Sequence, residues 1–359
     1  MSNNSSAASS HSSSSSHDST WLLYVFVGAS VVLVALVLAC VCYSMRRASK
    51  ASVDLVALDP PENEVPSMEI RLQKYFLHGH LKAKKHIASG THCVVFRATY
   101  EEQDVALKTP LASLLKRADH AEIMEAFATE ILLCARLQHQ HIIGFVGVVF
   151  KSMQNITLVT EFMELGNVAT LLSLEDSAKY KWLSTKKAPV TKLSWALGVA
   201  QALAYMHGMD LTHRGLKAKN VLLTTNLSVK LSDMGLTRDK EVELSLANTH
   251  SRSAGNIAPE LIVDAAPFSP AADMYAFGAF LCELDTCKPP FSNLEAGSGG
   301  LDNTQIALLV GQGKMQPKFS YSCPDPILAL ATACMDARPP KRPTALTVVQ
   351  QLKQIQATL

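Results

Sequence analysis

One uncharged, apolar segment most constrains what this chain can fold into. Residues Trp21–Tyr43 contain no Asp, Glu, Lys or Arg. As a helix rising about 1.5 Å per residue, this segment would be about 35 Å long, enough to cross a hydrocarbon core of about 30 Å with some tilt. We therefore expect a single transmembrane helix at 21–43, and keep a cleaved signal peptide or a buried core helix as alternatives.

The charges on the two sides of this segment predict its orientation. Residues 1–20 contain no Lys or Arg, whereas Arg46, Arg47 and Lys50 follow the segment. Positively charged flanks stay on the cytosolic side of a membrane. We expect residues 1–20, a Ser-rich tail, to lie outside the cell and the C-terminal part to lie in the cytosol, with membrane lipid around the helix.

Three prolines, Pro60, Pro61 and Pro66, interrupt regular structure in residues 44–80, which we interpret as a juxtamembrane linker. No comparable break follows, so residues 81–359 are expected to form one domain. The net charge of +2 excludes a strongly basic nucleic-acid-binding protein, and eight scattered cysteines exclude a small disulfide scaffold.

Within 81–359, apolar residues alternate with polar ones in some segments, mostly early in the chain, and recur at helical spacing in others. Alternation predicts strands at His86–Ala88, Cys93–Ala98, Asp104–Thr109, Phe145–Phe150 and Ile156–Thr160. Helical spacing predicts helices at Ala121–Leu137, Leu193–Met206, Asp273–Leu284, Gln305–Val310, Pro326–Met335 and Ala345–Gln354. This order predicts an α+β fold with a small β-rich lobe and a larger helical lobe, and a cleft between lobes is a common ligand site.

Several motifs follow one another in this domain. The sequence Ala-Ser-Gly-Thr-His-Cys-Val-Val at 88–95 surrounds a predicted turn, and Val-Ala-Leu-Lys at 105–108 lies in a predicted strand. Further along come His-Arg-Gly-Leu-Lys-Ala-Lys-Asn at 213–220, Asp-Met-Gly at 233–235 and Ala-Pro-Glu at 258–260. In this order and spacing, the motifs resemble the signature set of protein kinases. The chain from about Lys84 to Leu352 is similar to a protein kinase catalytic domain, closest to the tyrosine-kinase-like serine/threonine group.

The resemblance implies a bilobal protein-kinase fold, ATP and Mg²⁺ as ligands, and a protein substrate or partner. It implies that Lys108 pairs with Glu130 in the following helix, that Glu260 pairs with Arg342, and that Asp273 braces the catalytic loop at 213–220. The implied catalytic positions are Lys108, Glu130 and Lys217, and the implied metal ligands are Asn220 and Asp233. The implied nucleotide-binding positions are Ala88, Ser89, Gly90, Cys93, Val95, Ala106, Lys108, Thr160, Glu161 and Met163.

The largest departure from the kinase pattern is Gly215. The family has an aspartate at this position, which accepts or orients the proton of the substrate hydroxyl. Glycine has no side chain that can do so. Loss of a positioned base typically costs about 10²–10⁴ in rate, so we expect phosphoryl transfer to be impaired without being excluded.

Two smaller departures accompany Gly215. Of the three glycines in the phosphate-loop pattern only Gly90 remains, because Ala88 and Cys93 replace the others, and we expect weaker nucleotide binding. The family pattern before Ala258 is Gly-Thr-x-x-Tyr/Trp-x. The stretch here reads as shortened, with Ser253 a poor substitute for the threonine.

Three functions remain open on these grounds. The first, favoured by the joint loss of aspartate and threonine, is a membrane-anchored pseudokinase that binds ATP and Mg²⁺ and acts as a scaffold or allosteric partner. The second is a serine/threonine kinase of low or unusual activity. The third is a structural membrane adaptor that binds no nucleotide.

Overall fold

The computed structural model describes residues 67–90, 93–174, 179–183, 190–233, 254–264, 266–292, 294, 301 and 303–358. These residues belong to one compact unit that begins at Ser67. The expected extracellular tail and most of the linker lie outside the described residues. So does most of the activation segment, by which we mean residues 233–260, from Asp-Met-Gly to Ala-Pro-Glu.

The structure corrects the expectation of a transmembrane helix. None of the helices in the described ranges is long and apolar enough to cross a membrane. Trp21–Tyr43, on which the expectation rested, lies outside these ranges. The bilobal α+β fold is confirmed, and the membrane helix is not part of the fold class that the structure supports.

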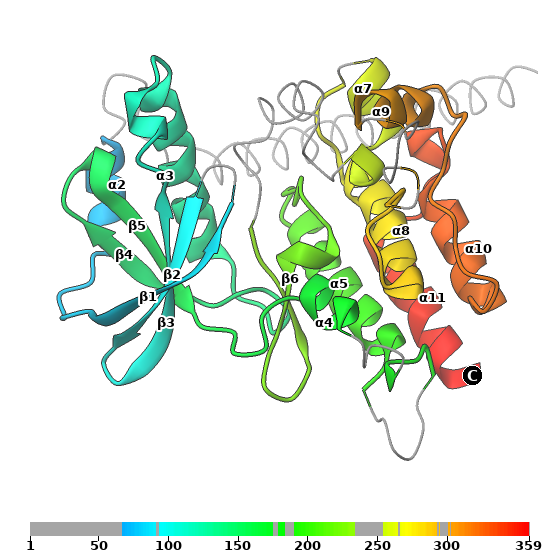
Figure 1. The fold of residues 1–359 in the computed structure, drawn as a ribbon, viewed down its shortest axis with the longest axis horizontal. Coiled ribbons are helices and arrows are strands. Elements are labelled where there is room, and N and C mark those ends of the chain that lie inside the picture. Colours follow the sequence, from blue (N-terminus) through cyan, green and yellow to red (C-terminus); the bar gives the residue numbers. More distant parts are fainter. Residues whose placement is uncertain are drawn as a thin grey trace, which may run out of the picture. The chain divides into compact units, whose positions relative to one another are not determined.

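The N-terminal lobe is built on an antiparallel sheet of five strands in the order β1-β2-β3-β5-β4 (Figure 1). The strands are β1 (Lys82–Ser89), β2 (Cys93–Tyr100), β3 (Gln103–Pro110), β4 (Phe145–Phe150) and β5 (Ile156–Glu161). One helix of this lobe, α3 (His120–Arg136), carries Glu130 on its buried side. On one face of the sheet, Val105, Leu107 and Val159 form a small apolar cluster, which leaves the other face for the candidate site.

A short helix, α2 (Met68–Gln73), precedes the sheet and lies within the stretch that we interpreted as a linker. Its Leu72 is fully buried, and Phe76 forms a parallel bridge with Val148 of β4. With six residues, α2 is too short to show a helical repeat of apolar residues, so its sequence alone does not distinguish it from a linker. The ordered unit therefore begins before residue 81.

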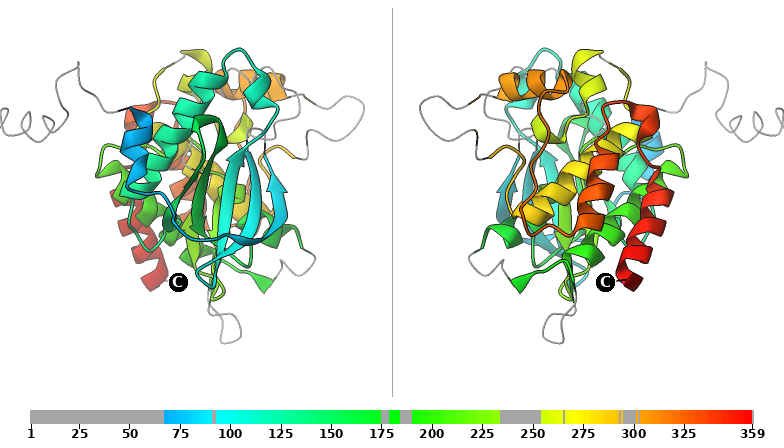
Figure 2. Two further views of the ribbon diagram at one scale, coloured as in Figure 1. Left: turned by 90° about the vertical axis from the view of Figure 1, so that its left-hand side faces the viewer. Right: turned by 90° about the vertical axis from the view of Figure 1, so that its right-hand side faces the viewer.

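The C-terminal lobe is mainly helical (Figure 2). Its helices are α4 (Val168–Ser173), α5 (Lys192–His207), α7 (Pro259–Val263), α8 (Pro270–Thr286), α9 (Asn303–Gly311), α10 (Asp325–Cys334) and α11 (Ala345–Thr358). A two-stranded hairpin, β6 (Val221–Leu223) and β7 (Val229–Leu231), follows the catalytic loop. The longer helices begin at local signals: Thr191 and Ser194 form a capping box for α5, and Ser269 caps α8 before Pro270.

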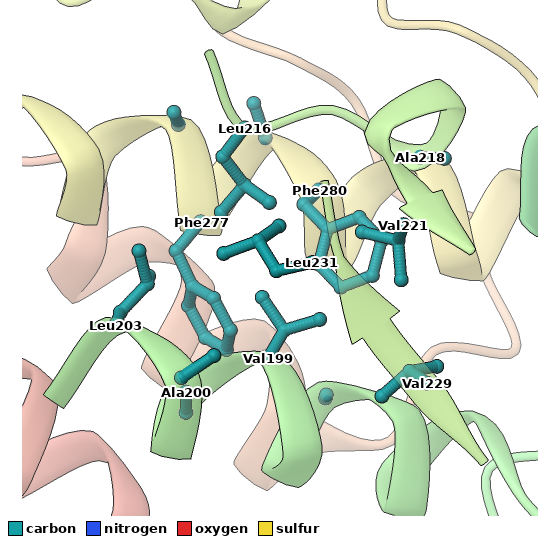
Figure 3. Close-up of a cluster of buried hydrophobic side chains, with 14 of the residues drawn as sticks. Val199, Ala200, Leu203, Leu216, Ala218, Val221, Val229, Leu231, Phe277 and Phe280 are labelled. Atoms are coloured by element: carbon teal, nitrogen blue, oxygen red, sulfur yellow. The ribbon is translucent and has the colours of Figure 1, made fainter. Parts of the chain in front are cut away.

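An apolar cluster supports the catalytic loop from below (Figure 3). Leu216 and Ala218 of the loop are buried in it, together with Phe277 and Phe280 of α8 and Leu231 of β7. Because side chains alternate along this extended segment, burial of residues 216 and 218 directs the side chain between them away from the core. This packing therefore fixes the orientation of Lys217.

The expected pair between Glu260 and Arg342 is present and buried. Arg342 Nη1 and Nη2 donate to the two carboxylate oxygens of Glu260 at 2.7 Å each, and Nε donates to the carbonyl of Asp336 at 2.8 Å. The Arg342 side chain has no solvent exposure. All three guanidinium nitrogens therefore donate hydrogen bonds. Removal of Arg342 leaves the largely buried Glu260 carboxylate without this partner.

We predict that Arg342→Ala lowers the free energy of unfolding by about 3–5 kcal/mol, the usual cost of breaking a buried ion pair from one side. The matched control is Arg338→Ala, because Arg338 pairs with Asp336 but is 71% exposed, and we expect a loss of about 0–1 kcal/mol. Urea denaturation of both variants measures the difference. Equal losses in the two variants would contradict the structural role of the buried pair.

Candidate nucleotide-binding site

The strand register places several of the predicted nucleotide-binding residues on one face of the sheet. Val95 of β2 lies opposite Ala88 of β1 and Lys108 of β3. Ala106, two residues before Lys108, lies opposite Thr160 of β5. Residues opposite one another, and residues two apart on a strand, project from the same face. The structure therefore brings residues from four strands to one surface, opposite the small apolar cluster.

Lys108 is the centre of this surface. Its Nζ lies 2.7 Å from Glu130 Oε1 and 2.7 Å from Asp233 Oδ1, so the expected pair with Glu130 is present and Asp233 joins it. Burial opposes the charge of the ammonium, but the carboxylates of Asp233 and Glu130 outweigh it and hold the pKa of Lys108 well above its usual value. Lys108 is a fixed positive charge at all ordinary pH values.

The turn between β1 and β2 holds the remnant of the phosphate loop. The backbone N–H of Gly90 donates to the carbonyl of Cys93 at 2.8 Å, and Ser89 Oγ contacts His86 Nε2 at 2.9 Å. Among the described residues, a Cβ atom added at Gly90 would meet only the Cys93 carbonyl, at 3.5 Å. This Gly90–Cys93 hydrogen bond joins the described ends of β1 and β2, and Ala88 and Cys93 stand where the family has glycines.

The end of β5 and the residues just after it contain three of the predicted nucleotide-binding positions, Thr160, Glu161 and Met163. Glu161 Oε1 accepts from Lys230 Nζ of β7 at 2.6 Å and from the N–H of Gly144 at 2.5 Å. These contacts tie the sheet lobe to the hairpin of the helical lobe. Thr160 lies on the candidate surface, and Met163, two residues after the strand, is buried.

The catalytic loop is held by a buried carboxylate, as the resemblance implied. Asp273 of α8 accepts from the N–H of His213 at 2.7 Å and from the N–H of Arg214 at 2.9 Å. Arg214 has φ of 61° and Asp233 has φ of 56°, both in the left-handed region. Non-glycine residues in this region carry strain that the surrounding structure must support, and such residues cluster at functional sites.

The two predicted metal ligands flank this loop. Asn220 Nδ2 donates to the carbonyl of Gly215 at 2.8 Å, so Oδ1 is the amide atom left to ligate a cation. The Asp233 side chain is 47% exposed. No three His, Cys, Asp or Glu side chains in the described part of the chain could hold a metal by themselves. One amide oxygen and one carboxylate fit Mg²⁺ when phosphate oxygens supply further ligands.

A second buried carboxylate behind the loop was missed by the sequence reasoning. Glu283 of α8 accepts from the N–H of Ala218 at 3.2 Å and from Asn256 Nδ2 at 2.9 Å. Burial raises the pKa of Glu283 to about 7, while Asn256, Ala218 and the charge of Lys217 oppose the rise. A glutamate in the last turn of a mostly apolar helix was the available signal, since such a residue is buried only with partners.

The contact of Asn256 also bears on the length of the activation segment. Counting back from Ala258 places Asn256 at the Tyr/Trp position of the family pattern and Ser253 at the threonine position. The pattern therefore fits without a gap, and the shortening that we expected is not required. Ser253 itself lies outside the described residues.

Comparison with known proteins agrees with the fold. Residues 81–352 match the family described as protein tyrosine and serine/threonine kinase, so the chain belongs to this family. It is 29% identical over 266 residues to the serine/threonine/tyrosine-protein kinase HT1 of Arabidopsis thaliana, covering 74% of this chain and 64% of HT1. It is also 29% identical over 275 residues to the serine/threonine-protein kinase CTR1 of the same organism, covering 76% of this chain and 31% of CTR1. The match thus spans less than two thirds of the length of either relative.

We predict a pH-dependent effect of Glu283. A carboxyl whose pKa rises from 4.5 unfolded to about 7 folded binds its proton more tightly in the folded state, so its contribution to stability falls as pH increases between these values. Relative to the parent, Glu283→Gln should gain about 3 kcal/mol between pH 4.5 and pH 8. Denaturant titrations at several pH values measure the difference.

The control for this measurement is Glu125→Gln, because Glu125 is exposed on α3. Its stability relative to the parent should stay within about 0.5 kcal/mol over the same range. A constant difference between Glu283→Gln and the parent across pH would show that the carboxyl of Glu283 titrates at its ordinary pKa.

Proposed function

We propose that this domain binds ATP with Mg²⁺ but transfers phosphate poorly, and that it acts as a scaffold or allosteric partner of other proteins. The single observation that carries the proposal is the contrast within one site. Lys108 is paired with Glu130 and Asp233, while the position that supplies the family's catalytic carboxylate is Gly215. The charged clamp for a nucleotide persists without the group that handles the proton of the substrate.

Each residue of the clamp has a defined part in this proposal. Lys108 attracts the phosphates, and Glu130 keeps its ammonium in place. Asn220 and Asp233 would hold Mg²⁺, which neutralises phosphate charge when bound. Lys217 projects from the loop above its apolar support. The replaced glycines in the turn reduce the close backbone approach that phosphates need, so binding is weaker than in typical kinases.

A second function is favoured by a different observation. The intact Lys108–Glu130–Asp233 arrangement, together with relatives named as kinases, supports a working serine/threonine kinase of low activity. Phosphoryl transfer depends mainly on positioning and charge, both of which this site keeps in part. Measured transfer by the unmodified protein, lost in Lys108→Ala, would favour this function over the first.

We predict that Mg-ATP raises the melting temperature of the protein and that Asp233→Ala removes the Mg²⁺-dependent part of the rise. Ligand at about 100 times its Kd adds about 2.7 kcal/mol of stability. The control is Glu125→Ala, because Glu125 is an exposed residue of α3. A parent protein with no nucleotide-dependent shift would favour an adaptor without nucleotide, and an unchanged Mg²⁺-dependent shift in Asp233→Ala would refute the metal assignment.

We predict that Gly215→Asp increases phosphate transfer by at most about 10²–10⁴ over a very slow parent, because it returns the carboxylate that positions the substrate hydroxyl. Transfer to a generic protein substrate, measured with labelled ATP, gives the rates. The double variant Gly215→Asp with Lys108→Ala should lose the gain. Since replacing a glycine also changes loop entropy, melting temperatures of all variants are compared before a gain is assigned to chemistry.

A further inference from the structure

The described unit contains a segment that the family match does not include. Residues Ser67–Leu77 precede residue 81, where the match begins, yet they form α2 and the bridge to β4. We call this segment the α2 strut. Ser67 caps the helix through its side chain, and Leu72 is fully buried in the apolar cluster that also contains Met124 and Phe127 of α3.

The C-terminal half of the strut is bonded to the edge of the sheet. The N–H of Leu77 donates to the carbonyl of Val148 at 2.9 Å, and the N–H of Val148 donates to the carbonyl of Tyr75 at 2.9 Å. The Phe76 ring stacks on Phe150 of β4, with centroids 4.6 Å apart and planes 10° apart. These contacts add an isolated parallel bridge at Phe76 to the β4 edge of the sheet.

One position of β4 is shaped for this contact. A Cβ atom placed on Gly147 would lie 2.7 Å from Leu77 Cγ and 3.1 Å from the Tyr75 carbonyl. A side chain at residue 147 would therefore force the Leu77 side chain to move, and the Tyr75 carbonyl of the strut would have to shift by a few tenths of an ångström. Gly147 is buried and does not have a positive φ, so close approach of the strut is the steric reason for glycine that the structure shows.

We propose that the α2 strut is a positioning element for α3 and, through α3, for Glu130. Among the elements that the structure describes, α3 packs mainly on α2, on β4 and on the turn at Leu114–Lys116. Glu130 lies on α3 and reaches Lys108 from a side chain that is only 5% exposed. A displaced strut removes one of the main supports of the helix, so Glu130 no longer stays within reach of Lys108.

The proposal rests on the proposed function only where it links the Lys108–Glu130 pair to nucleotide binding. If release of the strut lowers the binding-competent fraction to about a tenth, the apparent Kd for Mg-ATP rises about tenfold. The order of α3 is independent of nucleotide and can be measured without it.

The test uses the full chain with two independent changes, Gly147→Val on the sheet and Phe76→Ala on the strut. Hydrogen exchange should accelerate in residues 67–77 and in 120–136, and the Kd for Mg-ATP should rise about tenfold. Phe76→Tyr retains the stacked ring and should behave as the parent. The matched control is Leu352→Ala in α11, whose fully buried side chain lies in the other lobe. It should lower the melting temperature while leaving exchange in 120–136 and the Kd unchanged.

Faster exchange in 67–77 with unchanged exchange in 120–136 overturns the proposal, because the strut is then released without effect on α3. Unchanged exchange in 67–77 for both variants overturns it as well, since the contacts with Gly147 and Phe150 of β4 then do not hold the strut in place. Should the parent bind no Mg-ATP, the proposed function fails, and exchange in 120–136 still decides whether the strut positions α3.

Discussion

The ammonium of Lys108 is shared between two carboxylates from different parts of the chain, and the rest of the site depends on this arrangement. Glu130 comes from α3 of the sheet lobe, and Asp233 follows the hairpin of the helical lobe. A buried lysine is costly unless it is paired. With both partners in place, the pKa of Lys108 stays well above its ordinary value, and the same contacts connect the two lobes at the candidate site.

The catalytic loop keeps its structural supports but lacks the reactive side chain. Its backbone is held by Asp273, its apolar side chains pack on α8, and Glu283 fixes it from behind through Ala218. The framework that positions a catalytic carboxylate is therefore intact, although Gly215 supplies no carboxylate. A domain with the proposed function keeps the framework of the loop and lacks only the reactive group. A general loss of the fold would remove the framework as well.

Much of the fold could be predicted from the sequence, because its longer elements carry clear periodicity. The strand Phe145–Phe150 was predicted with the observed bounds, and the predicted helix Ala121–Leu137 differs from α3 by one residue at each end. The hairpin β6–β7 was missed because its strands have three residues each, too few for a periodic signal. The strut was missed because its burial depends on a partner surface, including Gly147, that lies far away in the sequence.

The candidate site was predictable where a motif fixes a residue type and unpredictable where a contact is specific to this chain. The pairs Lys108–Glu130 and Glu260–Arg342 followed from motif order and are present. The contact of Asn256 with Glu283 could not be foreseen, because it needs an amide where the family has an aromatic ring. The transmembrane helix that we expected as part of the fold class was wrong, because none of the described helices is long and apolar enough to cross a membrane. The length of an apolar segment is only a local signal.

The most direct test is a single-turnover experiment with γ-labelled ATP, the full chain in excess of the ATP and a generic protein substrate as phosphate acceptor, quenched over time. We predict that ATP binds in a Mg²⁺-dependent manner and is recovered almost entirely intact after many minutes. Conversion of bound ATP at the roughly 1–100 s⁻¹ typical of protein kinases, abolished by Lys108→Ala, would contradict it and show that Gly215 is compatible with efficient catalysis.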